Sequence, residues 1–240
     1  YLNEARLAAA LAHDGLVTVY DVGHTDRRDI NGGENNDSQN NDSQTDDSQT
    51  NNRVIYVVLQ YISGKTLKQL LKEKRLEFTA IAELLIEVAE ALQYAHDAGL
   101  IHRDIKPANI MISEPTGKPV VTDFGLAILK SQARAHSSFS GSLPWMSPEQ
   151  AKCEGHKLSG RTDVFALGVI LYEAMTGRRP FRGTELQIRS AIESEDPRPP
   201  QQLDSTIPDE LQRICLKALA KRPSDRYDAR EFAADLQAWL

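Results

Sequence analysis

The stretch that decides the fold reads His102-Arg103-Asp104-Ile105-Lys106-Pro107-Ala108-Asn109. It is followed, 14 residues after Asn109, by Asp123-Phe124-Gly125 and later by Ser147-Pro148-Glu149. A lone Asp or Asn in a loop usually serves as a cap or a turn residue, and a lone Asp-Phe-Gly arises often by chance. Three such elements in this order and at these spacings are hard to explain by coincidence, so they mark the candidate functional site.

The segments around these loops predict a mainly helical chain with short strands. Ile110 to Ile112 and Val120 to Thr122 are expected to form two strands joined by a turn that contains Pro and Gly. Phe165 to Met175 is apolar on every side except Glu173, which is typical of a helix buried all round. We expect this helix at the centre of the core.

Further helices should pack against it. One has an apolar stripe at helical spacing and a candidate N-cap at Thr79; the stripe consists of Ile81, Leu84, Leu85, Val88 and Leu92. Two more amphipathic helices are expected at about Asp209 to Ala220 and Ala229 to Leu240.

The first 59 residues predict a smaller unit. Leu2 to Leu11 is rich in Ala and Leu and is followed by His13-Asp14-Gly15, which predicts a helix with a glycine stop. Leu16 to Val22 and Val54 to Leu59 are rich in Val, Ile and Tyr, so we expect them to pair as an antiparallel hairpin with a long tip.

The expected tip is a low-complexity tract from about His24 to Asn52. It contains the repeat NNDSQ, NNDSQ, TDDSQ and a single aliphatic residue, Ile30, so it cannot offset the entropy of ordering. Seven acidic residues against two arginines give it a net charge of −5. We expect a disordered insertion in a surface loop, since loop closure costs little extra as a loop lengthens. A docking or phosphorylation tail is the alternative.

Composition bounds the class of protein. The chain has 240 residues, of which 40% are hydrophobic and 26% charged, so it can bury a sizeable core. Its net charge of −6 argues against a protein that coats nucleic acid, so no nucleic-acid partner is expected. Its two cysteines, Cys153 and Cys215, lie far apart without zinc-ligand spacing, which fits a reducing cytoplasm. No apolar run approaches the ~20 residues that span a bilayer.

The three loops resemble the signature of the protein kinase family: a catalytic loop, a metal-binding Asp-Phe-Gly and a variant of Ala-Pro-Glu. The resemblance covers Tyr1 to Leu240 and is strongest toward bacterial Ser/Thr kinases of the eukaryotic type. It implies an α+β protein kinase-like fold, with a mainly α-helical C-lobe and a truncated N-lobe of one helix and a β-hairpin. Residues 1–59 would be the N-lobe remnant and residues 60–240 the hinge and C-lobe.

The resemblance also implies the chemistry, which is transfer of the γ-phosphate of ATP to Ser or Thr hydroxyls of proteins. Asp104 would orient or accept the proton of the substrate hydroxyl, and Lys106 would place a cation beside the phosphate and mark Ser/Thr specificity. Asn109 and Asp123 would bind Mg²⁺, which prefers hard oxygen ligands. Ala108 stands where related kinases that favour basic substrates often have Glu, so no strong preference for Arg is expected.

Adenine should meet the segment after Leu59, which the resemblance makes the gatekeeper. The backbones of Gln60 and Ile62 would hydrogen-bond the purine, Thr66 would lie near the ribose, and Met111 would pack beneath the ring. The expected cofactors are therefore ATP and Mg²⁺.

Other residues would serve as scaffold. His102 and Phe124 would stack in the core, and Asp163 would hold the catalytic-loop backbone by hydrogen bonds. Glu149 and Arg226 would form a buried ion pair, whose disruption leaves one charge uncompensated.

One part of the family pattern has no counterpart in the sequence. No Gly-rich phosphate loop and no strand Lys precede Glu4, which stands where the helical partner of that Lys belongs. Because the chain begins with Tyr1 rather than Met, we expect a fragment of a longer kinase, which would itself bind Mg-ATP weakly and turn over slowly. The alternative is a catalytically silent, kinase-like binding module. The intact Asp104, Lys106, Asn109 and Asp123 weigh against it.

Arg103, directly before Asp104, marks kinases of this family whose activation loop is ordered by phosphorylation. The loop offers Ser137 and Ser138 as the candidate phosphosites, with Ser142 in the substrate-facing turn. Expected partners are protein substrates with Ser or Thr acceptors, and a homodimer is a candidate assembly for autophosphorylation. The expected location is the cytoplasm, with any membrane anchor of the parent protein outside this chain.

Overall fold

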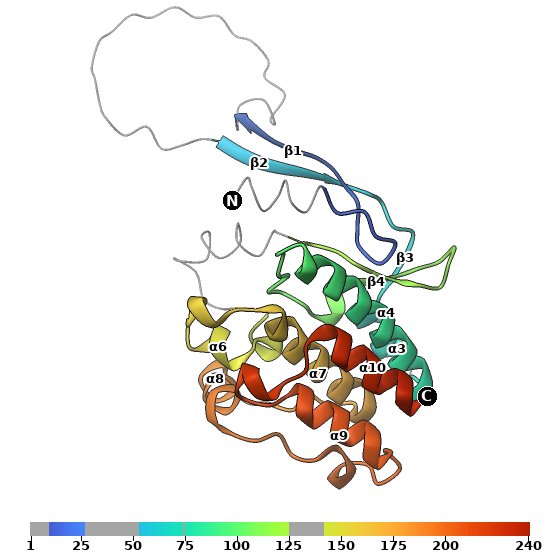
Figure 1. Cartoon of the computed structure of the whole chain (residues 1–240), viewed down its shortest axis with the longest axis vertical. Helices are drawn as coiled ribbons and strands as arrows, with labels where there is room; N and C mark the ends of the chain where they lie inside the picture. The colour runs from blue at the N-terminus through green and yellow to red at the C-terminus, as the bar shows by residue number, and fades with distance from the viewer. Residues whose placement is uncertain (1–9, 27–52, 74, 125–141) are drawn as a thin grey trace, which may run out of the picture.

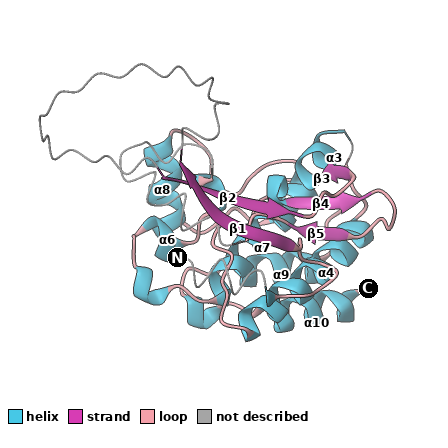
Figure 2. Cartoon of the chain, turned by 90° about the horizontal axis from the view of Figure 1, so that it is seen from above, coloured by secondary structure: helices cyan, strands magenta, loops and turns pink. Residues whose placement is uncertain are grey.

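The computed structural model describes residues 10–26, 53–73, 75–124 and 142–240. A two-stranded hairpin lies at one end of the molecule and a body of helices at the other (Figure 1). A second, three-stranded sheet lies between them. Viewed from above, the strands of both sheets lie over the helices (Figure 2). This arrangement agrees with the expected α+β class.

The hairpin consists of β1 (Val19–Asp26) and β2 (Arg53–Leu59), paired antiparallel from Val19 opposite Leu59 to Asp26 opposite Arg53. The predicted pairing is confirmed, but the bounds of the first strand are wrong at both ends. Its last three residues fall inside the tract expected to be disordered from His24. Backbone hydrogen bonds sustain a strand without apolar side chains, which is why composition alone placed its end too early.

The residues assigned to the start of that strand have a different role. Leu16 forms an isolated parallel bridge with Val121, in which Val17 N donates to Val121 O at 2.9 Å and Val121 N donates to Gly15 O at 2.8 Å. Residues 15–17 therefore connect the hairpin to the second sheet.

Deleting Gly32 to Thr50 is expected to shift the melting temperature by no more than ~2 °C. The deleted residues lie between the paired positions Asp26 and Arg53, which the hairpin already holds together. Halving a loop changes its closure free energy by only about 0.6 kcal/mol, which is a shift of ~2 °C in a domain of this size. Thermal unfolding of both forms measures the effect, with a Gly-Ser replacement of equal length as control. A loss of several degrees on deletion would show that the tract makes stabilising contacts.

The second sheet has the strand order β3-β4-β5 and is antiparallel throughout, with β3 (Gly64–Thr66), β4 (Ile110–Ser113) and β5 (Pro119–Val121). The predicted pair of strands is confirmed, although β5 begins and ends one residue earlier than expected. The sequence did not predict β3, because three residues are too few to show an alternating pattern.

The helical body is built around α4 (Phe78–Asp97) and α7 (Gly160–Thr176). Every residue of α7 from Thr162 to Met175 is buried except Glu173, as predicted for the central helix. The N-cap of α4 is Glu77 without a side-chain hydrogen bond, so Thr79 lies inside the helix and its predicted capping role is wrong. Four residues of the predicted stripe are buried in α4, and Leu84 is partly buried.

The two predicted terminal helices are α9 (Asp209–Ala218) and α10 (Ala229–Trp239), of which α10 packs against α4. Three helices were not predicted: α3 (Leu67–Glu73), α6 (Pro148–Ala151) and α8 (Glu185–Ser194). Short 3₁₀ turns occur at Pro107–Asn109, Leu143–Trp145, Gly155–Lys157, Pro200–Gln202 and Pro223–Asp225.

Both cysteines are free thiols, with Cys153 exposed and Cys215 buried. In the part of the chain that the structure describes, no helix combines the length and the apolar character needed to cross a membrane.

Candidate active site

Asp104 and Lys106 meet in the loop between α4 and β4. Lys106 Nζ lies 2.7 Å from Asp104 Oδ2 and 2.8 Å from Ser142 Oγ, so one ammonium group joins the loop to the turn that carries Ser142. Asn109 donates its Nδ2 to the backbone oxygen of Asp104 at 2.8 Å. The loop is therefore braced by its own side chains.

The carboxyl group of Asp104 is ionised in this setting. Burial alone would raise the pKa of Asp104, but the hydrogen bond and the charge of Lys106 outweigh it and hold the pKa below its usual value. A buried carboxylate beside one cation can accept a hydrogen bond from a hydroxyl group placed next to it.

Asn109 and Asp123 lie at neighbouring ends of β4 and β5. Thr122, next to Asp123, donates its backbone N to Asn109 O at 2.9 Å. Asn109 uses its side-chain nitrogen on Asp104, which leaves the amide oxygen as a possible ligand. Asp123 has a φ of 66°, a strained value for a residue other than Gly. One carboxylate and one amide oxygen suit Mg²⁺, which takes few protein ligands and completes its shell with phosphates and water.

His102 and Phe124 stack as expected, edge to face, with ring centroids 4.5 Å apart. His102 is fully buried and its Nε2 lies 2.8 Å from the backbone oxygen of Thr122. The ring therefore ties the loop of Asp104 to the segment that leads into Asp123, and it has no exposure that a proton shuttle would need.

Asp163, at the start of α7, binds the backbone of the same loop. Its Oδ2 accepts from His102 N at 2.9 Å and its Oδ1 from Arg103 N at 2.8 Å. The Nε2 of His96 on α4 lies 2.8 Å from Oδ2. Burial would raise the pKa of Asp163, but the hydrogen bond and charge of His96 and the other donors lower it overall.

The residues expected around adenine lie at the end of β2, in the segment that leads into β3, and in the neighbouring strands β3 and β4. The backbone N of Gln60 already donates to Thr18 O at 2.9 Å, so only its carbonyl remains for a purine. Thr66 and Met111 are paired across β3 and β4, and both are partly buried, as is Ile62. Leu59 ends β2 and packs against the hydrophobic core.

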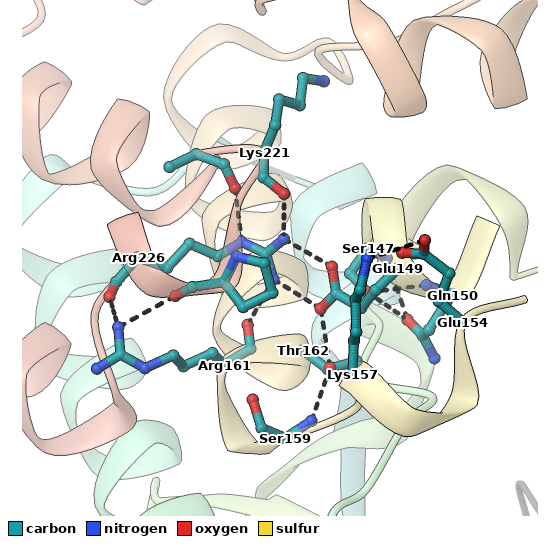
Figure 3. A network of polar contacts seen from close by, with 12 residues as sticks. Ser147, Glu149, Gln150, Glu154, Lys157, Ser159, Arg161, Thr162, Lys221 and Arg226 are labelled. Atoms are coloured by element: carbon teal, nitrogen blue, oxygen red, sulfur yellow. Dashed lines mark hydrogen bonds and ion pairs between the residues drawn. The ribbon is translucent and has the colours of Figure 1, made fainter. Parts of the chain in front are cut away.

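Glu149 and Arg226 form the expected ion pair, deep inside the protein (Figure 3). Arg226 Nη1 donates to Glu149 Oε1 at 2.8 Å and Nη2 to Oε2 at 2.7 Å, and both side chains are at most 2% exposed. Thr162 Oγ1 adds a bond of 2.9 Å to Oε1. Burial would raise the pKa of Glu149, but Arg226 lowers it overall. The pair fixes α6 against the helical body.

A cavity of about 620 Å³ opens beside the loop that carries Asp104 and Lys106. Its walls include Pro107, which follows Lys106, and Trp145, which closes the turn of Ser142. Four cationic side chains also line it: Lys68, Lys72, Arg75 and Arg179. Among the described lining residues, Glu173 is the one carboxyl group, and burial raises its pKa.

Glu4, Ser137 and Ser138 lie outside the described residues, and their roles stay predictions. Several contacts around the loop were not predicted from the sequence. They include the contact of His96 with Asp163 and the bond from Gln150 Nε2 to Arg103 O at 2.7 Å. Each joins residues at least 47 positions apart, so no local pattern in the sequence indicates it.

The protein kinase domain family matches residues 1–236 of the chain. A probable serine/threonine-protein kinase of Clostridium perfringens is 38% identical over 99% of this chain and 31% of its own length. The serine/threonine-protein kinase PknB of Mycobacterium tuberculosis is 34% identical over 98% of this chain and 35% of its own. The chain thus spans about a third of these relatives.

A solved structure supports the fold. The PknI kinase domain of Mycobacterium tuberculosis superimposes with a TM-score of 0.69 at 22% identity, over 99% of this chain and 76% of that one. The family match covers nearly the whole chain, and the relatives agree with it. The chain belongs to the protein kinase family.

Proposed function

We propose that this protein is a Ser/Thr kinase, which transfers the γ-phosphoryl group of ATP to serine or threonine hydroxyls of proteins. The observation that carries the proposal is the contact of Lys106 with both Asp104 and Ser142. It places an ionised carboxylate and a cation together beside an open cavity, which is the pair of charges that phosphoryl transfer to a hydroxyl requires.

Each charged group has one task in this proposal. Asp104 orients the acceptor hydroxyl and takes its proton, and Lys106 neutralises charge on the transferring phosphoryl group. Asn109 and Asp123 hold Mg²⁺, which neutralises the phosphates of ATP when bound. No observation in the described residues favours the catalytically silent alternative, because all four side chains are present and three are joined by hydrogen bonds.

We propose that adenine lies between Leu59 and Met111, with the carbonyl of Gln60 and the backbone of Ile62 as its polar partners and Thr66 near the ribose. Residues 1–59 would then form the remaining part of a small lobe, and residues 60–240 the hinge and large lobe. The cytoplasm as location and a homodimer for autophosphorylation are proposed with the function.

The test is phosphate transfer from radiolabelled ATP to a generic acceptor protein, followed by phosphoamino-acid analysis. Label on serine or threonine that requires Mg²⁺ supports the proposal. Absence of label, under conditions in which the protein binds Mg-ATP, would favour the catalytically silent alternative.

The cavity beside Pro107 predicts a preference for acidic substrates. Arg75 is paired with Asp204, but Lys68, Lys72 and Arg179 form no ion pair within the described residues. Glu173 is the opposing carboxyl group among the described lining residues, and four cationic side chains outnumber it. Exposed charge pairs contribute about 0.2–1 kcal/mol each, so several should together lower KM by about tenfold for peptides with Asp or Glu near the acceptor.

Peptides that differ only by Asp or Lys next to the acceptor serine measure this preference. Reversing Lys68 and Lys72 to Glu should abolish it and leave kcat nearly unchanged, and high salt should weaken it. Lys118→Glu, outside the cavity lining, is the control. Equal KM values for the two peptides would contradict the assignment.

A further inference from the structure

The side chain of Gln150 binds two separate segments, the start of α6 and the backbone of Arg103. Its Oε1 accepts from Ser147 N at 3.0 Å and thereby completes the capping box at the start of α6. Its Nε2 donates to the backbone oxygen of Arg103 at 2.7 Å. Figure 3 shows Gln150 beside Ser147 and Glu149 in α6.

The peptide that receives this bond is strained. Arg103 has a φ of 65°, in the left-handed region that residues other than Gly avoid, and it directly precedes Asp104. Such a conformation costs about 1–3 kcal/mol and persists only where surrounding contacts impose it. The backbone of Arg103 is held from both sides: Asp163 accepts from its N at 2.8 Å, and Gln150 donates to its O at 2.7 Å.

The two anchors come from different helices. Asp163 belongs to α7 in the centre of the core, whereas Gln150 belongs to α6, which follows the turn that carries Ser142. Asp163 therefore fixes the loop to the core, and Gln150 fixes it to the end of the segment that faces the substrate.

We propose that Gln150 is a positioning residue for catalysis, which holds the Arg103–Asp104 peptide in the conformation that aims the Asp104 carboxylate at the acceptor hydroxyl. This inference rests on the proposed kinase activity. It makes the order of α6 a condition for the alignment of Asp104, so that loosening α6 lowers turnover without affecting ATP binding.

Gln150→Glu removes the bond to Arg103 and keeps the bond from Ser147 N. A carboxylate still accepts from Ser147 N and retains the capping box, but it cannot donate to the carbonyl oxygen of Arg103. Loss of one hydrogen bond of ordinary strength corresponds to about a tenfold change. We expect kcat to fall about tenfold, with the KM for ATP and the melting temperature close to those of the unaltered protein.

Two further variants supply the controls. Ser147→Ala removes the bonds of Ser147 Oγ to Gln150 N and Oε1 and so weakens the cap, but it keeps the bond from Ser147 N to Gln150 Oε1 and the bond to Arg103. It should lower the melting temperature and leave kcat nearly unchanged. Gln150→Met removes both bonds without adding charge, so it should lower kcat as Gln150→Glu does and melting temperature as Ser147→Ala does.

Hydrogen exchange of the peptide that spans residues 100–109 gives a readout independent of activity. Exchange there should rise several-fold in both Gln150 variants and stay unchanged in Ser147→Ala. If the unaltered protein does not transfer phosphate, the proposed function fails while exchange still tests the contact. If it does transfer phosphate but Gln150→Glu keeps its kcat and exchange rates, the positioning role is wrong. A loss of kcat shared by Ser147→Ala would likewise overturn it.

Discussion

Asp104→Asn is expected to lower phosphotransfer by about 10²-fold or more, which is the scale for loss of a positioned acid–base group. An amide can still accept the hydrogen bond from Lys106, but it cannot take the proton of the acceptor hydroxyl. Asn109 binds the backbone oxygen of Asp104 and keeps its place. Affinity for Mg-ATP should therefore remain nearly unchanged.

Turnover and nucleotide affinity, measured separately, test this expectation. Asp97→Asn is the matched control, because Asp97 is an exposed carboxylate that pairs with Arg230 far from the loop. Normal turnover by Asp104→Asn would contradict the assignment of the base. A parallel loss of Mg-ATP affinity would show instead that Asp104 holds the nucleotide.

Arg226→Met is expected to destabilise the fold by about 3–5 kcal/mol, the range for removing one partner of a buried ion pair. It leaves the carboxylate of Glu149 buried without its cation. It also removes donors from three backbone carbonyls that the guanidinium binds, those of Ala220, Arg161 and Lys221. Denaturant unfolding measures the loss in unfolding free energy, with the same dependence on denaturant concentration applied to both proteins.

The double variant Glu149→Leu with Arg226→Met should recover part of this loss, because no buried charge remains. Recovery should be incomplete, since the three carbonyls still lack donors. Lys157→Met, which breaks an exposed pair with Glu154, is the control and should change stability little. A double variant less stable than either single variant would contradict the ion-pair account.

The same pair predicts a pH dependence. The pKa of Glu149 lies below its ordinary value of 4.5, so the unfolded chain takes up the proton first as pH falls. The contribution of Glu149 to stability is therefore complete above its ordinary pKa and is lost as pH falls through the lowered one. The stability curves of the unaltered protein and of the double variant should converge in acid, where the carboxyl group is protonated in both states.

The sequence predicted the parts of the fold that depend on long periodic patterns or on distinctive side chains. The apolar run of α7 and the stripe of α4 indicated buried helices, and the order of Asp104, Asn109 and Asp123 in the sequence indicated the candidate site. These signals are local. They do not depend on which distant segments meet.

The features that the sequence did not predict depend on contacts between segments that are distant in the chain. The three residues of β3 form a strand because β4 offers them hydrogen bonds. Gln150 looks like an ordinary capping-box residue, and only the position of α6 against the loop gives its amide a second partner. Leu16 lies in a segment with the composition of a strand, but it pairs with Val121 of the other sheet, because residues 15–17 lie beside β5 before the hairpin begins.

The bridge between residues 15–17 and β5 attaches the hairpin to the second sheet. Two backbone hydrogen bonds fasten the base of the hairpin to Val121, and Asp123 lies only two residues further along. A swing of the hairpin about this bridge would displace its far end, near Asp26 and Arg53, much more than Asp123. Under the proposed function, the hairpin could therefore move over a nucleotide while the carboxylate proposed to bind Mg²⁺ stays next to Asn109.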